Sequence, residues 1–212
     1  MKLYNYFRSG TSYRTRIVLN LKGLGYDYVP ISLLKGEQHG EAFRALNPQG
    51  LVPALDDDGF LLGQSPAIIE YLEEAYPEPP LLPKRARDRA HVRALAAIVG
   101  CDIHPINNLR VLKYLRETLG QNEESVKTWC GTWIAKGFDA YEALLRADRK
   151  RGGFSFGNAP TIADAYLIPQ VFGAERFGVD LAPWPEIGAV NARCRALPAF
   201  ADAHPSKQPD AE

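Results

Sequence analysis

The spacing of hydrophobic residues up to Tyr76 alternates between the period of a strand and the period of a helix. Short apolar runs predict strands at Leu3–Tyr6, Tyr26–Ile31, Val52–Leu55 and Phe60–Leu62. Apolar residues three or four positions apart predict a helix after each of the first two strands and another after Ser65. A helical crossover makes the first two strands parallel, whereas the turn Asp56–Gly59 predicts an antiparallel hairpin. The resulting β-α-β-α-β-β-α order is that of a thioredoxin-like domain.

The pattern changes at Pro77–Pro83, which contains four prolines, and it is helical beyond that point. Apolar residues keep helical spacing in the segments Val92–Ile103, Leu109–Leu115 and Val126–Trp133. Further on, Thr161–Asp164 has the residue types of a capping box, in which a threonine and an acidic side chain accept backbone N–H groups at a helix start. We therefore predict a thioredoxin-like α/β domain at 1–77, a linker at 78–84 and an all-α helical-bundle domain at 85–212.

Composition and charge narrow the range of partners. With 25 acidic and 25 basic residues among 212, the chain has no net charge that would attract nucleic acid or an anionic membrane. No apolar run is long enough to span a bilayer, and the segment after Met1 lacks the apolar core of a signal peptide. The three cysteines stand far apart, which indicates neither a disulfide framework nor a redox pair. We expect a cytoplasmic protein with a small-molecule partner.

Motifs for several common chemistries are missing from the sequence. It contains no phosphate-binding loop of the Walker type, no Gly-x-Gly-x-x-Gly and no Gly-x-Ser-x-Gly elbow. The four histidines are scattered, so no metal site is predicted. The basic run Lys84–Arg89 includes an aspartate and no aromatic residue, which favours a solvated helix face over a nucleic-acid site.

The stretch Phe7–Arg16 places hydroxyl groups where the first helix begins. Ser9, Thr11 and Ser12 follow the first strand and precede the first apolar residues with helical spacing. Unpaired backbone N–H groups and the positive end of the helix dipole at such a point favour a bound carboxylate, phosphate or thiolate. The alternative is that one of these residues is no more than an N-cap, and the stretch alone favours this alternative, because caps are more common than anion sites.

Eight segments, in this order along the chain, resemble the zeta class of glutathione transferases. They are Phe7–Ser9, Ala45–Pro48, Val52–Pro53, Gln64–Glu74, Asn107–Leu109, the capping box at Thr161, Ala174–Phe177 and His204–Pro205. The resemblance covers nearly the whole chain. It implies the glutathione transferase fold, with glutathione as the cofactor, and a homodimer.

The resemblance also implies how glutathione is held, extended across the thioredoxin-like domain. A cis proline at Pro53 would let the backbone of Val52 pair with the cysteinyl part. Gln64 and Ser65 would bind the γ-glutamyl carboxylate at a helix start. The expected cofactor contacts also include Gly10, Thr11 and Gln38. From the residues alone, Pro53 is an ordinary trans turn proline and Ser65 is a plain N-cap.

One departure from the family lies at the first helix. The family usually has Ser-Ser-Cys where this chain has Ser9, Gly10 and Thr11. Ser9 is retained, and it is our candidate for the hydroxyl that hydrogen-bonds the glutathione sulfur and favours thiolate over thiol. Thr11 replaces the cysteine, which argues against a requirement for that cysteine. His104 takes the position of a glutamine that contacts glutathione in the family, from the partner subunit; a capping or packing histidine is the alternative.

Members of the family isomerise maleyl keto acids by adding the glutathione thiolate to the cis double bond and expelling it after rotation. Their substrates carry two carboxylates, which guanidinium groups bind bidentately. The candidates for this role are Arg8, Arg110 and Arg176, with Asn108 as a further substrate contact. Animal maleylacetoacetate isomerases commonly have a small polar residue at the position of Arg110, so this extra cation suits the shorter maleylpyruvate. An arginine one turn into a helix is, however, usually solvent-facing.

The resemblance therefore implies a glutathione-dependent cis–trans isomerase that converts maleylpyruvate to fumarylpyruvate, as in bacterial gentisate breakdown. Maleylacetoacetate isomerase is the close alternative. A detoxifying glutathione transferase would use the same thiolate and leave stable conjugates. A non-catalytic glutathione-transferase-like binding module would form no thiolate.

Overall fold

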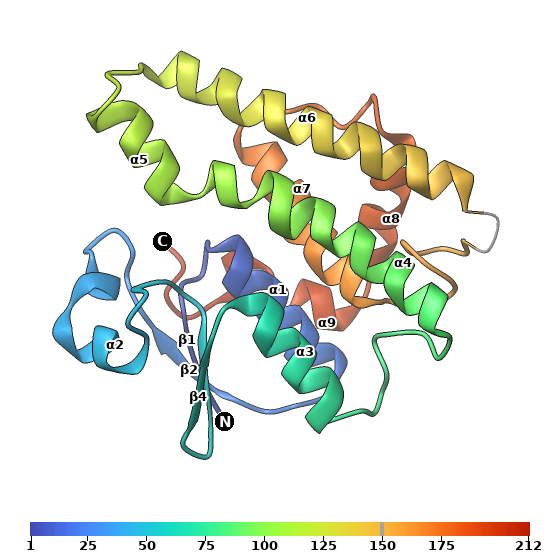
Figure 1. The fold of residues 1–212 in the computed structure, drawn as a ribbon, viewed down its shortest axis with the longest axis horizontal. Helices are drawn as coiled ribbons and strands as arrows, with labels where there is room; N and C mark the ends of the chain where they lie inside the picture. The colour runs from blue at the N-terminus through green and yellow to red at the C-terminus, as the bar shows by residue number, and fades with distance from the viewer. Residues whose placement is uncertain (149–150) are drawn as a thin grey trace. The chain divides into compact units, whose positions relative to one another are not determined.

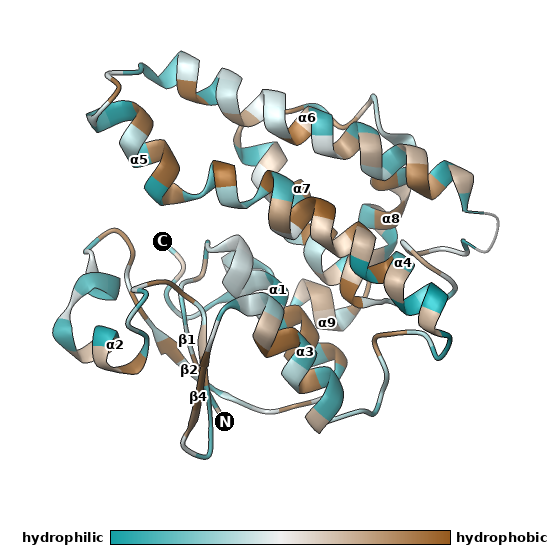
Figure 2. Ribbon diagram, in the orientation of Figure 1, coloured by the Kyte–Doolittle hydropathy of each residue, from teal (hydrophilic) through white to brown (hydrophobic). Residues whose placement is uncertain are grey.

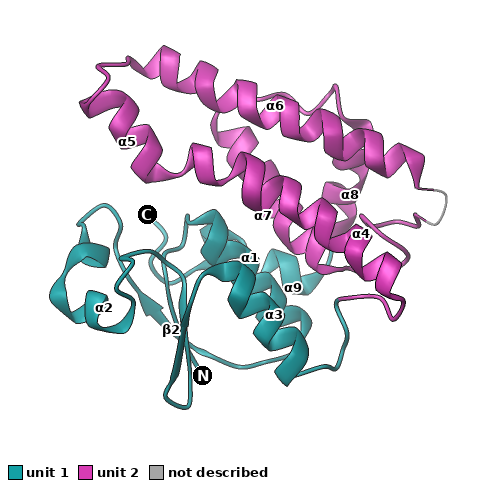
Figure 3. Cartoon of the chain, in the orientation of Figure 1, with its two compact units in different colours: residues 1–81, 195–212 teal, residues 82–194 magenta. Residues whose placement is uncertain are grey.

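The protein, seen here in a computed structural model, is described over residues 1–148 and 151–212 (Figure 1). The chain divides into two compact units, residues 1–81 with 195–212, and residues 82–194 (Figure 3). These bounds differ from the predicted domains at two places. Residues 78–81 and the C-terminal tail from Arg195 both belong to the first unit, because polar side chains of its first helix bind them.

The first unit contains a four-stranded mixed sheet with the predicted topology. Its strands are β1 (Lys2–Asn5), β2 (Asp27–Pro30), β3 (Ala54–Asp57) and β4 (Phe60–Gly63), in the order β2-β1-β3-β4. β1 is parallel to β2 and antiparallel to β3, and β3 is antiparallel to β4. Leu3 at the centre of the sheet is fully buried and lies opposite Tyr28 on one side and Leu55 on the other. The predicted β-α-β-α-β-β-α order is confirmed.

The hairpin between β3 and β4 is tighter than predicted. Asp56 and Asp57 belong to β3, and Asp57 pairs with Phe60, so the loop consists of Asp58 and Gly59 alone. Both loop residues have positive φ, 51° and 92°, which is the conformation that matches the twist of a two-residue hairpin. An Asp-Gly pair adopts it at low cost because glycine has no Cβ. The expected turn at Asp56–Gly59 is thereby shortened by two residues.

Three helices complete the α/β part of the first unit: α1 (Gly10–Leu21), α2 (Glu41–Leu46) and α3 (Ser65–Ala75). α1 packs against α3. Hydrophobic residues recur along α3 at intervals of three or four positions with polar residues between them, as expected for a helix with one buried face (Figure 2). α1 is buried on more than its apolar face, since Arg14 and Arg16 are only 2% and 0% exposed.

The segment after α3 is held to the first unit by a buried ion pair. Lys22, at the end of α1, lies 2.8 Å from the Glu73 carboxylate and donates to the carbonyls of Tyr76 and Pro79. The Glu73 carboxylate also accepts the backbone N–H of Leu81 at 3.0 Å. A buried charge needs such complete pairing, so residues 76–81 are fixed rather than free.

The second unit is helical. It contains α4 (Ala86–Ala97), a π-helical turn (Ile98–Ile103), a 3₁₀ turn (Pro105–Asn107), α5 (Leu109–Glu117), α6 (Glu123–Ala147), α7 (Ile162–Arg176) and α8 (Pro185–Arg195), of which the last residue belongs to the first unit. The tail then forms α9 (Pro198–Ala201) and a 3₁₀ turn (Pro205–Lys207) in the first unit. None of the helices among the described residues is long and apolar enough to cross a membrane.

Helix α7 forms the centre of the second unit. Eleven of its 15 residues are buried, and α4 packs against it. The predicted capping box is confirmed at its start, where the Asp164 carboxylate accepts the backbone N–H of Thr161 at 2.8 Å. The same carboxylate accepts the backbone N–H of Ser155 at 2.8 Å, so it fixes the preceding loop as well as the helix start.

We predict that replacing Asp164 by alanine lowers the free energy of unfolding by about 2–4 kcal/mol, because it leaves the buried N–H groups of Ser155 and Thr161 without an acceptor. Urea unfolding of the purified variant measures the loss. Asp102→Ala, at an exposed position of the same unit, is the control and should change stability by no more than about 0.5 kcal/mol. Equal losses in the two variants would contradict the capping role.

Candidate functional site

Three residues of the first unit form a chain of hydrogen bonds at the start of α1. The Thr11 hydroxyl donates to the carbonyl oxygen of Val52 at 3.0 Å. Because a hydroxyl has only one hydrogen, Ser9 must be the donor in the 2.9 Å contact between the Ser9 and Thr11 hydroxyl oxygens. Ser9 Oγ accepts the backbone N–H of Ser12 at 3.3 Å, which makes Ser9 the N-cap of α1. The hydroxyl hydrogens of Ser9 and Thr11 thus point in sequence toward the Val52 carbonyl.

The loop that carries Ser9 is fixed by its backbone. The N–H of Ser9 donates to the carbonyl of Tyr6 at 3.1 Å, and the N–H of Phe7 donates to the Asp210 carboxylate at 3.1 Å. Gly10 is the first residue of α1. The guanidinium of Arg8, a half-buried residue, lies 5.6 Å from the centre of the Phe7 ring, a distance at which a cation is attracted to an aromatic face.

The peptide bond between Val52 and Pro53 is cis, as the family resemblance implies. Val52 is buried in a small hydrophobic cluster with Tyr6, Phe7 and Phe43. The cluster therefore joins the segment before β3 to the loop after β1, which brings the Val52 carbonyl within reach of Thr11.

A second polar group lies at the start of α3. Gln64, rather than Ser65 as expected, is the N-cap residue; its φ is 67°, and its side-chain amide donates to Gln49 at 2.6 Å. Ser65 is 2% exposed, and its hydroxyl oxygen has no hydrogen-bond partner among the described residues. A buried hydroxyl without a partner is costly, and here it stands at a helix N-terminus, where the helix dipole favours an anion.

Gln38 is a third polar group that is buried in the first unit. It belongs to a 3₁₀ turn (Glu37–His39) and is 6% exposed, and its side-chain oxygen has no partner within residues 1–148 and 151–212. Gly50 passes close to it: a Cβ on this glycine would lie 2.9 Å from the Gln38 carbonyl, and its φ is +64°. The turn after α2 therefore packs tightly against Gln38.

The other four predicted site residues belong to the second unit. Asn108 is the N-cap of α5, and its side-chain oxygen accepts the backbone N–H of Arg110 at 3.2 Å. Arg110 is exposed in the first turn of this helix. His104 lies between the π-helical and 3₁₀ turns, and Arg176 ends α7, exposed, with its guanidinium 6.0 Å from the Phe172 ring centre.

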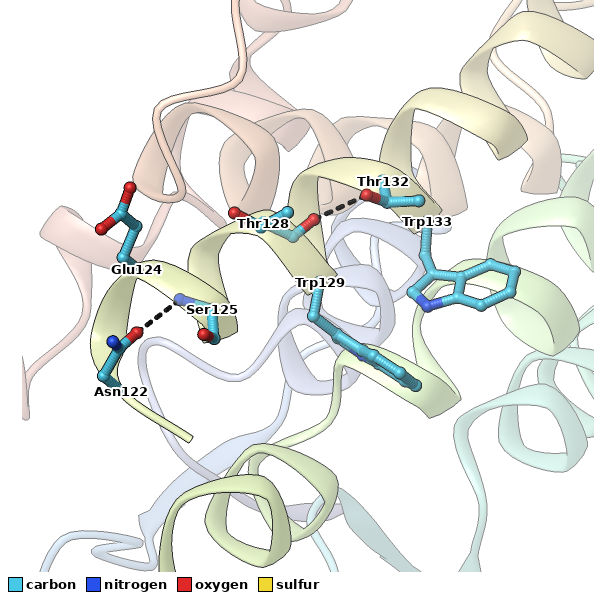
Figure 4. A pocket seen from close by; sticks show the side chains of 7 residues that line it. All are labelled: Asn122, Glu124, Ser125, Thr128, Trp129, Thr132 and Trp133. Carbon is cyan, nitrogen blue, oxygen red and sulfur yellow. Dashed lines mark hydrogen bonds between the residues drawn. The ribbon is translucent and has the colours of Figure 1, made fainter. Parts of the chain in front are cut away.

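A cavity of about 530 Å³ lies along the first half of α6 (Figure 4). Trp129 and Trp133 project to the same side of the helix, and the indole N–H of Trp129 donates to the carbonyl of Ile106 at 3.0 Å. The rest of the lining is polar: Asn122, Glu124, Ser125, Thr128 and Thr132. Among the described residues that line this cavity, none is a predicted site residue, and Glu124 is the only one with an ionisable side chain.

Two contacts of the predicted residues could not be predicted from any pattern in the sequence. Gln49, the partner of Gln64, stands in the turn Asn47–Gly50, whose composition indicates a turn but no contact with Gln64. Asp210, which binds the backbone of Phe7, stands in a tail without periodicity. Both depend on segments that come together only in the fold. In contrast, Ser9, Thr11 and Val52 were all named from the sequence, and the structure brings them together.

Comparison with known proteins gives consistent matches along the chain. Residues 3–80 match the family model of the glutathione S-transferase N-terminal domain, and residues 132–202 match that of the C-terminal domain. The chain is 63% identical to a maleylpyruvate isomerase of a Ralstonia species over 210 residues, 99% of each chain.

Two solved structures are similar over all of both chains. One is the holo structure of a maleylpyruvate isomerase, described as a bacterial glutathione S-transferase of the zeta class, with a TM-score of 0.99 and 62% identity. The other is a maleylacetoacetate isomerase of Methylobacterium extorquens AM1 with bound malonate and glutathione, with a TM-score of 0.96 and 41% identity.

Proposed function

Because the chain belongs to the zeta class of the glutathione S-transferase family, we propose that it is a glutathione-dependent cis–trans isomerase that converts maleylpyruvate to fumarylpyruvate. The observation that carries this proposal is the 63% identity to a maleylpyruvate isomerase along 99% of both chains. The place of the reaction in gentisate breakdown is part of the proposal. A maleylacetoacetate isomerase is the second candidate, favoured by the similarity to the Methylobacterium extorquens enzyme.

The polar groups of the first unit fit glutathione as the cofactor. The hydroxyl of Ser65 lies beside Gln64 at the start of α3 and has no hydrogen-bond partner in the described part of the chain, which suits the γ-glutamyl carboxylate. The Val52 backbone, next to the cis bond to Pro53, suits the cysteinyl part. The remaining proposed contacts are Ser9, Gly10, Thr11, Gln38 and His104. The glutathione-binding role falls to the domain proposed at residues 1–77, joined by a linker at 78–84 to a domain at 85–212 that contributes substrate contacts.

Bound glutathione supplies the thiolate that adds to the cis double bond and leaves after rotation. The protein's part is to hold that sulfur as a thiolate. Ser9 is the hydroxyl proposed to donate to it, at the positive end of the α1 dipole. The chain of hydrogen bonds restricts this donation, because the single hydroxyl hydrogen of Ser9 already points at Thr11. Ser9 must therefore rotate its hydroxyl away from Thr11 to donate to sulfur. Thr11 competes with the sulfur as an acceptor for the Ser9 hydrogen.

Four residues are proposed to hold the keto acid. Arg8 and Arg176 each suit a carboxylate, because guanidinium groups bind it bidentately and stay charged when partly desolvated. Asn108 contributes its amide N–H groups, since its side-chain oxygen already caps α5. Arg110, exposed beside it, is the cation that would favour the shorter maleylpyruvate over maleylacetoacetate.

The proposal includes a homodimer in the cytoplasm. All three cysteines are free thiols, which suits a reducing compartment. The substrate is a small dicarboxylate, and the similar enzyme of Methylobacterium extorquens was solved with malonate, itself a dicarboxylate.

We predict that substoichiometric glutathione supports complete conversion of maleylpyruvate, because the thiolate that adds to the double bond is expelled again. Loss of the maleylpyruvate absorbance at several glutathione concentrations measures this, beside a parallel assay with maleylacetoacetate. If conversion stopped at one equivalent and a conjugate accumulated, a detoxifying transferase would be the better assignment.

We predict that Ser9→Ala raises the pKa of bound glutathione and lowers kcat by about one to three orders of magnitude, as expected for the loss of one charge-stabilising donor. Thr11→Val should change kcat and the pKa of bound glutathione less than Ser9→Ala does. In this variant the Ser9 hydroxyl is still present and loses only Thr11, the acceptor that competes with sulfur. Thr11→Ser, which keeps the hydroxyl chain, is the matched control. Ultraviolet titration of the bound thiolate measures the pKa, and a larger loss at Thr11 than at Ser9 would exchange their roles.

We predict that Arg8→Ala or Arg176→Ala lowers kcat/KM for the keto acid by the equivalent of about 1.5–3 kcal/mol, as for loss of a hydrogen bond to a charged group, with glutathione affinity nearly unchanged. Arg110→Ala should penalise maleylpyruvate more than maleylacetoacetate. Arg87→Ala, at an exposed position of α4, is the control for a general change of charge. Equal losses for the two substrates at Arg110 would remove its part in substrate choice.

A further inference from the structure

The backbone of Phe7 is held by charged groups on both of its sides. Its N–H donates to the Asp210 carboxylate at 3.1 Å, and the Phe7 carbonyl accepts from the guanidinium of Arg16 at 2.8 Å. Hydrogen bonds to charged groups are stronger than neutral ones. The peptide that joins Tyr6 to Phe7 has such a bond at each end, because the Tyr6 carbonyl also accepts from Arg16, at 3.4 Å. The orientation of the two peptides that flank Phe7 is therefore strongly determined.

The cation of this pair cannot easily move. Arg16 is fully buried, and it also donates to the side chain of Asn5 at 2.9 Å and to the carbonyls of Tyr6 and Ala203 at 3.4 and 3.1 Å. Burial lowers the pKa of Arg16, while Asp210 is among the groups whose charge raises it.

The anion is fixed from two directions. The phenol of Tyr28 on β2 donates a short hydrogen bond to the Asp210 carboxylate. Burial, together with this hydrogen bond, raises the pKa of Tyr28, so the phenol keeps its proton and remains a donor. The tail around Asp210 is ordered by its own contacts, because the buried side chain of Gln208 donates to the carbonyls of Asp202 and His204 at 2.8 and 2.9 Å.

We propose that Asp210 is a positioning residue for the reaction: by holding the backbone N–H of Phe7 it sets the orientation of Arg8 and Ser9, the two residues that follow. The inference rests on the proposed function, in which Arg8 holds a substrate carboxylate and Ser9 the glutathione sulfur. It assigns the C-terminal tail of this chain, far from Ser9 in sequence, to the scaffold of the site. Other backbone hydrogen bonds of the loop join it to the Ser12 hydroxyl, to neighbouring backbone groups and to Arg16.

The test compares Asp210→Ala and Asp210→Asn with Glu212→Gln, which removes one negative charge from an exposed position two residues further along. In Asp210→Ala, kcat for maleylpyruvate should fall at least about tenfold, the scale of a small misplacement of reacting groups. The pKa of bound glutathione should rise, and the Phe7 amide should exchange its hydrogen faster. Asp210→Asn keeps one acceptor oxygen, so each of these three changes should be smaller than in Asp210→Ala. Glu212→Gln should leave kcat, the pKa of bound glutathione and the exchange of the Phe7 amide unchanged.

A purely structural role would give a different result. If the melting temperature fell but the folded Asp210→Ala protein kept the wild-type kcat and the wild-type pKa of bound glutathione, the proposal would be overturned. If Asp210→Ala did not fold, the same measurements on Asp210→Asn and Tyr28→Phe would decide; Tyr28→Phe removes only one hydrogen bond of the carboxylate. An unchanged kcat and an unchanged pKa of bound glutathione in both variants would overturn the proposal.

The same experiment separates this inference from the proposed function. The wild-type enzyme assayed with maleylpyruvate tests the function directly. The pKa of bound glutathione and the exchange of the Phe7 amide test the role of Asp210 without any isomerase assay. A wild-type protein that bound glutathione without isomerising the keto acid would overturn the function and still report whether Asp210 orients the loop.

Discussion

The start of α1 is arranged around one buried cation, the guanidinium of Arg16. Taking such a group out of water costs several kcal/mol unless its donors are satisfied, and Arg16 satisfies them with Asn5, Tyr6, Phe7 and Ala203. These acceptors come from the end of β1, from the following loop and from the C-terminal tail. A single requirement for hydrogen bonds therefore brings three segments together and leaves the loop little freedom.

The consequence for the candidate site is geometric. A loop fixed at Tyr6 and Phe7 places Ser9 at the N-cap of α1, where its hydroxyl meets Thr11, and Thr11 in turn meets the carbonyl of Val52. Hydroxyls have rotational freedom that backbone groups lack, so the direction of these hydrogens is the adjustable part of a rigid frame. Catalytic donors work best in such a frame, because orientation is supplied before the reaction rather than during it.

Polar contacts also explain why the compact units differ from the predicted domains. Hydrophobic periodicity ends at Tyr76 and the prolines that follow look like a linker, yet Lys22 and Glu73 bind residues 76–81 to the first unit. The tail from Arg195 lacks clear periodicity, and Asn20 and Arg16 bind it to the same unit. Neither attachment depends on a repeating apolar pattern, so neither could be recognised from one.

The sequence by itself determined the order of strands and helices, the Asp-Gly hairpin and the capping box at Thr161, because each depends on local periodicity or on turn and cap chemistry. Its predictions failed by one or two residues at the boundaries of strands, at the hairpin loop and at the N-cap of α3, where neighbouring hydrogen bonds decide. Only the tertiary structure decided that Arg14 and Arg16 are buried, that Thr11 binds Val52 and that Asp210 binds Phe7, and that the Ser65 hydroxyl has no partner among the described residues. These properties depend on groups far apart in the chain, whose distance no local pattern encodes.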